Sequence, residues 1–328
     1  MRLILHAAVL SLACAAGLAC AATTPPVPLM PVLPPPDIIL DGAAKPAVPP
    51  AAQAAPQSAA QSATPAMPPS ARPDTDASTR ASIDRVLAGD WRRPANSARD
   101  RYRHPRETLG FFGFRDNLTV IEIWPSGGWY AELLAPALRG HGHYIGIIPK
   151  PSPAGDEKER ASTQRGNDAL RAQFAKRPDL FDSAELRESD NAAPDLGPPG
   201  SADLVLTFRN AHNWVMAGNE QAMFKAFYAV LKPGGTLGVV DHRAAPNQPP
   251  AEMQTSGYLP QAYVIALAEA AGFRLAGKSE VNANPRDTKD YPDGVWTLPP
   301  SLAKGDTDRA KYLAIGESDR MTLRFTKP

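Results

Sequence analysis

The sequence predicts a doubly wound α/β fold with a mostly parallel sheet, and three observations support this prediction. Apolar runs typical of buried strands occur at 118–124, 144–148, 202–208 and 236–240. Helical patterns lie between these runs. Residues 118–130, LTVIEIWPSGGWY, break from a strand into a glycine-containing turn and then a helical pattern. Strands that alternate with helices pair in parallel through right-handed crossovers, which gives this fold class.

The first residues have the pattern of a secretory signal peptide. Arg2 precedes an apolar run over 3–18, and small residues follow at 19–22. The run is too short for a comfortable membrane span. We therefore expect a signal peptide over 1–21, export to the periplasm and no transmembrane span after cleavage, with an uncleaved anchor as the alternative.

Both cysteines of the chain, Cys14 and Cys20, lie in that first segment. A mature chain without cysteine has no disulfide, which suits an oxidising compartment. Residues 17–20 loosely resemble a lipoprotein cleavage site, so a lipid anchor at Cys20 is a second hypothesis.

Composition then divides the chain into a linker and one domain. The sequence has 36 prolines among 328 residues, and 22–76 consists mostly of Pro, Ala, Gln, Ser and Thr. Such a segment cannot bury enough apolar surface to offset its ordering entropy, so we expect a disordered linker. The domain at 77–328 is long enough for a large core. A net charge of +1 indicates no nucleic-acid partner and no anionic lipid surface.

Within the domain, each helical pattern has a place between strands. We expect helices near 78–88, 129–138, 157–177, 219–231 and 258–271. The sequence LKPGG at 231–235 indicates a helix stop and a turn into the next strand. The run FRLAGKSEV and a terminal strand MTLRFT finish the chain.

Polar residues follow two of the predicted strands directly. The sequence FRNAHNW ends one strand, and Asp241, His242 and Arg243 end its neighbour. Carboxyl ends of central parallel strands face the ligand crevice, so the two clusters should face each other. Either histidine could act as a general base with Asp241 orienting the ring, and Trp214 could cover the site. The candidate catalytic residues are His212, Asn210, Asn213, Asp241 and His242.

Two other interpretations of these residues stay open. In a structural interpretation, Asp241 pairs with Arg243 and the asparagines brace turns. A metal site would use two histidines and an aspartate, but no HxH or HExxH spacing supports it, so we expect no metal.

The motifs together resemble a known family. EIWPSGGWY, FRNAHNW, VDHR and GESDRM resemble the marker motifs of a bacterial group of predicted methyltransferases. LKPGGTLGVV and AGF are similar to segments of class I S-adenosylmethionine-dependent methyltransferases. The resemblance covers most of 97–328. It implies a Rossmann-like sheet with an antiparallel C-terminal strand, and S-adenosylmethionine as the cofactor.

The resemblance also implies which residues contact the cofactor: Glu122, Trp124, Pro125, Ser126, Gly127 and Gly128. Two departures stand out. The common loop has glycine where this chain has Trp124 and Ser126, and a Cβ strains such a turn if φ is positive. Many relatives place an acid that holds the ribose hydroxyls where this chain has Pro149.

Several other segments could line the crevice. Residues 101–104 could cover it or recognise an acidic substrate, and Asn284, Asp287 and Trp296 are possible wall residues. Residues 317–320 are expected to form a charged turn before the last strand.

The predicted function is an exported methyltransferase that acts on a small-molecule or envelope acceptor. The alternative is a non-catalytic periplasmic protein that keeps the fold as a ligand-binding or structural module. A dinucleotide oxidoreductase is disfavoured, because SGGWYAE lacks the GxGxxG spacing.

Overall fold

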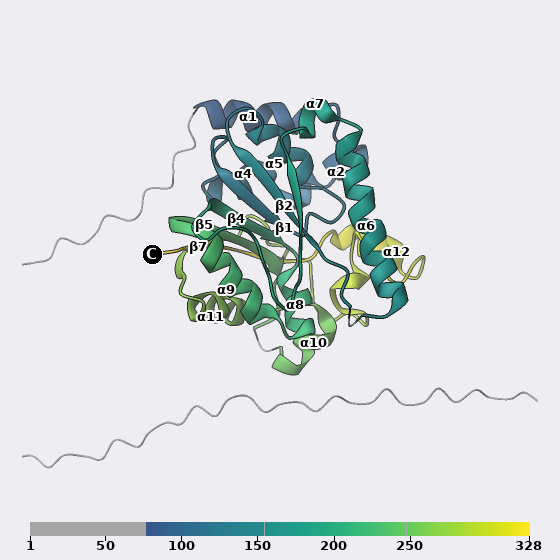
Figure 1. Cartoon of the computed structure of the whole chain (residues 1–328). Helices are drawn as coiled ribbons and strands as arrows, with labels where there is room; N and C mark the ends of the chain where they lie inside the picture. The colour runs from purple at the N-terminus through teal and green to yellow at the C-terminus, as the bar shows by residue number, and fades with distance from the viewer. Residues whose placement is uncertain (1–76, 154, 247) are drawn as a thin grey trace, which may run out of the picture. The chain divides into compact units, whose positions relative to one another are not determined.

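The structure is a computed structural model that describes residues 77–153, 155–246 and 248–328 (Figure 1). The predicted signal peptide, the anchor hypothesis at Cys20 and the linker at 22–76 lie outside the described residues. Among the helices that are described, none is both long and apolar enough to cross a bilayer.

Seven strands form one sheet in the order β3-β2-β1-β4-β5-β7-β6. β1 to β5 pair in parallel, and β7 runs antiparallel to both β5 and β6. This confirms the predicted doubly wound sheet and its antiparallel C-terminal strand. The strands are β1 (Thr119–Ile123), β2 (His143–Pro149), β3 (Glu185–Ser189), β4 (Ala202–Phe208), β5 (Leu231–His242), β6 (Arg274–Ser279) and β7 (Arg320–Thr326).

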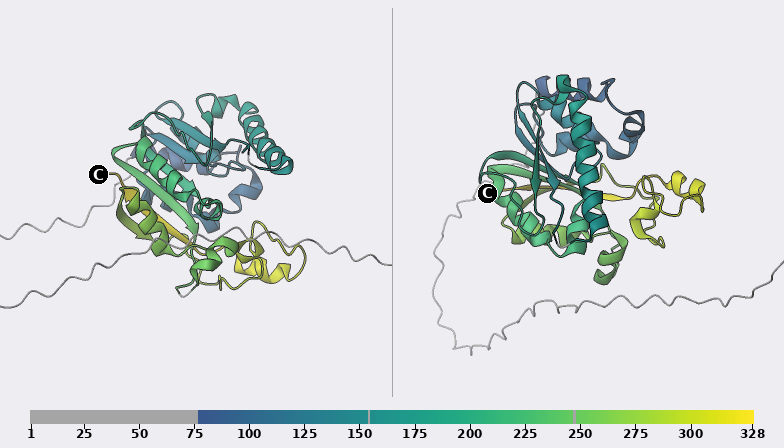
Figure 2. Two further views of the ribbon diagram at one scale, coloured as in Figure 1. Left: turned by 60° about the horizontal axis from the view of Figure 1, so that its bottom comes forward. Right: turned by 45° about the vertical axis from the view of Figure 1, so that its right-hand side comes forward.

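Two helical layers cover the sheet, one on each face (Figures 1 and 2). Side chains alternate along β1, so Val120 enters one core while Ile121 and Ile123 enter the other. The layer on the Val120 face comprises α1 (Ala77–Leu87), α4 (Pro105–Phe111), α5 (Ala131–Leu138), α6 (Glu157–Ala175) and α7 (Pro178–Phe181). The opposite layer comprises α8 (Ala211–Ala217), α9 (Glu220–Val230) and α11 (Gln261–Ala270).

Shorter helices lie in the connections. They are α2 (Pro94–Ser97), α3 (Asp100–Arg103), α10 (Met253–Ser256) and α12 (Arg309–Ile315), with 3₁₀ turns at Pro250–Glu252 and Gly294–Thr297. A small satellite core of Ala244, Tyr258 and Val295, with Trp296 against it, anchors the long connection before β7.

Two of the strands differ from the sequence prediction. β3 is an edge strand of mixed polar residues, so no apolar run predicts it. LKPGG is part of β5, which begins at Leu231 with an irregular pairing and Gly234 at φ +78°. The predicted turn is therefore a bulged strand start.

The strand order reverses between β1 and β4, which form the switch point of the sheet. In open α/β sheets, ligands bind outside the carboxyl ends of the strands at this point.

Candidate active site

A crevice of about 460 Å³ lies at the carboxyl ends of β1, β4 and β5. Five of the six residues predicted to contact a cofactor line it, as do four of the five predicted catalytic residues. They are Glu122, Trp124, Pro125, Ser126 and Gly127 in the first group, and Asn210, His212, Asn213 and His242 in the second.

The turn between β1 and α5 has an alternating left-handed backbone. The φ angles are +50° at Trp124, +52° at Ser126 and +76° at Gly128. Two of these positions carry side chains, and each costs on the order of 1–2 kcal/mol relative to glycine. The strain considered at Ser126 is therefore present. Residues in such sparsely populated conformations cluster at functional sites.

The two glycines of the turn have different surroundings. A Cβ at Gly127 would meet nothing closer than Arg93 Nη2 at 4.0 Å, so this residue is open to the crevice. A Cβ at Gly128 would lie 3.1 to 3.3 Å from Gln173 and Leu170 of α6. Gly128 therefore permits the packing of the turn on α6 and does not line the crevice.

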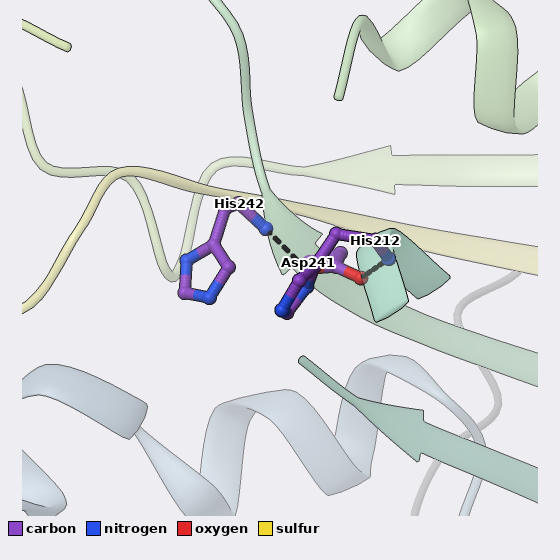
Figure 3. A group of neighbouring side chains, drawn as sticks. All are labelled: His212, Asp241 and His242. Atoms are coloured by element: carbon purple, nitrogen blue, oxygen red, sulfur yellow. Dashed lines mark hydrogen bonds and ion pairs between the residues drawn. The ribbon is translucent and has the colours of Figure 1, made fainter. Parts of the chain in front are cut away.

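His212 and Asp241 form a buried pair that joins α8 to β5 (Figure 3). His212 Nδ1 lies 2.9 Å from Asp241 Oδ1. Asp241 also accepts hydrogen bonds from the backbone N–H groups of His212 and His242. A carboxylate with three N–H neighbours acts as an acceptor, so His212 Nδ1 carries the proton. Its Nε2 has no partner among the described residues and is left as a base at the crevice.

His242 occupies a different environment. Its Nδ1 contacts Ser318 Oγ, and its Nε2 lies 3.4 Å from Arg209 Nε. Burial, then the neighbouring His212 and Arg209, hold its pKa well below the usual range for histidine. His242 is therefore neutral, with both ring nitrogens in contact. It suits a positioning role better than the predicted role of base.

Asn210 and Trp214 both have structural contacts. Asn210 Nδ2 donates to Ile123 O at 2.8 Å and so braces β4 against β1. Trp214 is fully buried and packs edge-on against Trp124, with ring centroids 5.6 Å apart. The expectation that Trp214 covers the site is wrong, because its ring lies in the core between the sheet and α9.

The structural interpretation of Asp241 is also wrong in detail. Arg243 pairs with Asp319 and Glu280, not with Asp241. Asp241 contacts the ring and the backbone amide of His212 instead.

Arginine side chains form much of the remaining wall. Arg93, Arg99, Arg103 and Arg209 all line the crevice. Of these, the sequence singled out only Arg103, within a segment suggested as a cover. Arg209 stands within the motif FRNAHNW but was not named as a candidate, whereas Arg93 and Arg99 belong to no motif and reach the crevice through tertiary folding.

Of the possible wall residues, Trp296 lines the crevice, with its ring centroid 6.0 Å from that of His212. Asn284 and Asp287 have structural contacts. Asn284 Nδ2 donates to Glu317 O, and Asp287 accepts from the Tyr258 hydroxyl. They hold the connection before β7 in place.

The turn between β1 and α5 separates the crevice from a second hollow of about 460 Å³ against α6. Both hollows include Trp124, Ser126 and Gly127. An elongated cofactor fits beside the turn that the two hollows share, because Gly127 has no side chain there to fill the space. The fit is weaker at the end of β2, since Pro149 offers no carboxylate for ribose hydroxyls.

His212, Asp241 and His242 could also be considered as metal ligands, because one ligand atom from each lies within 4.8 Å of the others. The hydrogen bonds of these side chains argue against a metal site. Asp241 is occupied by three N–H groups, and His242 Nε2 faces the Arg209 guanidinium. A cation here would meet an adjacent positive charge.

No family model and no curated protein sequence matches the chain. Among solved structures, it is similar to a SAM-dependent methyltransferase from Aquifex aeolicus, at 16% identity and a TM-score of 0.46 over 70% of this chain and 93% of that one. The cyclase SpnF has 16% identity and a TM-score of 0.49, over 77% and 98%. An arsenic(III) S-adenosylmethionine methyltransferase from Chlamydomonas reinhardtii has 15% identity and a TM-score of 0.42, over 75% and 72%.

Proposed function

We propose that this chain is a methyltransferase that uses S-adenosylmethionine to modify a small-molecule or envelope acceptor. The observation that carries the proposal is the His212–Asp241 pair, whose free Nε2 faces the crevice bounded by the β1–α5 turn. Methyl transfer to a protonated acceptor atom needs a base for the proton and space for the cofactor. The His212 Nε2 and the β1–α5 turn offer both at the switch point of the sheet.

S-adenosylmethionine, when bound, supplies an electrophilic methyl group. Trp124, Ser126 and Gly127 would hold it at the turn. His212 Nε2 takes the proton from the acceptor atom, while Asp241 keeps the ring in one tautomer and stabilises the imidazolium that forms. Trp296, which lines the crevice beside the His212 ring, would limit the access of water.

A non-catalytic ligand-binding protein is the second candidate. The observations that favour it are Pro149 at the end of β2 and the bulky Trp124 in the turn. Both remove features that commonly hold the cofactor.

We also propose export, on the pattern of residues 1–22 alone. Export bears on the choice between the two candidates, since S-adenosylmethionine is made in the cytoplasm.

Calorimetric titration of the full chain with S-adenosylmethionine and S-adenosylhomocysteine tests the proposal. We expect Gly127→Ala to bind as the wild type does, because its Cβ enters open space. Gly127→Phe fills that space and should weaken binding by more than about tenfold. Heat from neither ligand at millimolar concentration would favour the ligand-binding alternative. Equal affinity in the Phe variant would refute the placement of the cofactor at the turn.

A further inference from the structure

The arginines that line the crevice, together with the cluster that they form with Glu317 and Arg320, carry more positive than negative charge. Arg99, Arg103 and Arg320 share a single buried carboxylate, Glu317. Their Nε or Nη atoms lie 2.6, 3.4 and 3.0 Å from its oxygens. One of the Arg99 Nη atoms is buried and has no hydrogen-bond partner. One acid therefore offsets three guanidinium groups.

A fourth guanidinium, that of Arg209, adds to this excess. Among the described residues the Arg209 side chain makes no ion pair, and its one hydrogen bond is the long contact to His242. Burial lowers the pKa of Arg209 to about 10 and that of Arg103 to about 9, so both remain charged at neutral pH.

The nearby acids do not neutralise Arg209, because Glu317, the acid that acts on it most strongly, already pairs with three other arginines. Asp241 is committed to His212 and two backbone amides. Burial raises the pKa of Glu122 to about 8, so that carboxyl is mostly neutral at pH 7. An unpaired, half-buried guanidinium lowers the stability of the fold unless a ligand supplies the missing counter-charge.

The backbone at Arg209 is also strained, with φ at +63°. This left-handed residue directly follows β4, and its amide still bonds to Val240 O. The Arg209 side chain lines the crevice. Strain retained at a ligand-facing residue points to a function for that side chain.

Aromatic side chains line the same space. The rings of Tyr130 and Phe208 stack with centroids 3.4 Å apart, and Trp124 and Trp296 stand on other walls. The crevice thus combines apolar ring surfaces with guanidinium groups, which suits a ring-bearing organic anion.

We propose that the acceptor is a small organic anion whose carboxylate or phosphate group binds Arg209, with its apolar body against the aromatic walls beside His212. That this anion is the methyl acceptor rests on the proposed function. The anion site itself rests only on the charges and geometry of the crevice.

Calorimetric titration of the full chain with benzoate, phenyl phosphate and neutral benzamide tests the proposal without the cofactor. We expect at least one anion to bind, and benzamide to bind at least about tenfold more weakly. The tighter of the two anions identifies the recognised group. Failure of both anions to bind, or equal binding of benzamide, would overturn the proposal.

Two variants locate the site. Arg209→Asn, in which asparagine tolerates the left-handed backbone, should weaken anion binding at least about tenfold and leave S-adenosylhomocysteine affinity unchanged. Arg209→Lys should restore part of the affinity, since it keeps the charge without the planar fork. Arg177→Asn, which removes a surface arginine paired with Asp179, is the matched control and should bind like the wild type. Unchanged anion affinity in Arg209→Asn would refute the site.

A competition experiment with S-adenosylhomocysteine distinguishes an acceptor site from the cofactor's own site. Anion affinity that persists in saturating S-adenosylhomocysteine supports an acceptor site, whereas displacement would show that the arginines hold the cofactor's own carboxylate. Anion binding in a chain that does not bind S-adenosylhomocysteine would overturn the proposed function and leave the anion site standing.

Discussion

Glu122 shows how one residue can be chemically changed by its position in the sheet. It lies on the central strand β1, is almost fully buried, and accepts a hydrogen bond of 2.7 Å from the Tyr144 hydroxyl. Burial raises its pKa to about 8, although Tyr144 and Arg103 act in the opposite direction. The side chain is a carboxylic acid at neutral pH, so it limits the negative charge in the crevice.

Replacing Glu122 by Gln should flatten the dependence of stability on pH. The folded-state pKa lies above the unfolded value of 4.5, so the folded chain holds an extra proton between about pH 4.5 and 8. Wild-type stability therefore falls as pH rises through this window, by at most about 1.4 kcal/mol per pH unit. The Glu122→Gln variant should not lose stability in this pH window. Urea unfolding of both proteins at pH 5, 6.5 and 8 measures the free energy of unfolding. The same pH dependence in the two proteins would contradict a buried, neutral Glu122.

At the scale of elements, the His212–Asp241 pair connects the start of α8 to the end of β5. The backbone amide and the ring of His212 both contact the same carboxylate. The ring orientation is thereby set by two rigid elements, and Nε2 is held toward the crevice.

His212→Ala should preserve cofactor binding and reduce catalysis. Its ring does not belong to the β1–α5 turn, so S-adenosylhomocysteine affinity should stay within about twofold, while the rate of methyl transfer falls by about 10²–10⁴-fold. Calorimetry and single-turnover assays with an accepted anion measure the two effects. His141→Ala, which removes an exposed histidine, is the control. Normal turnover with lost affinity would contradict the role of base.

At the scale of the whole described domain, Glu317 joins distant parts of the chain. It contacts Arg99 and Arg103, more than two hundred residues earlier, and Arg320 at the start of β7. Burial alone would raise its pKa, but Arg320, Arg103 and Arg99 together lower it to about 2. The predicted charged turn at 317–320 is thus also the counter-charge of the crevice.

Glu317→Gln should destabilise the protein strongly, by about 3–5 kcal/mol at pH 7, because it leaves buried arginines without an acid. The folded-state pKa is depressed, so this contribution is complete above about pH 4.5 and declines as pH falls toward about 2. Urea unfolding at pH 7 and pH 3 measures both effects.

Glu280→Gln provides the comparison, since Glu280 is an exposed partner of Arg243 and should change stability by less than about 1 kcal/mol. Equal losses in the two variants would show that the arginine cluster does not depend on Glu317.

The sequence by itself determined the alternation of strands and helices, the turn after β1, and the approach of residues 210–213 to residues 241–242. These follow from local periodicity and from the rule that parallel strands share one carboxyl edge. Only the tertiary structure decided that Asn210 braces strands, that Gly128 faces α6, and that three arginines share Glu317. These outcomes depend on side chains far apart in the chain that meet through strand order and backbone handedness. Local sequence patterns encode neither property, because the energies that select them arise only when the sheet is assembled.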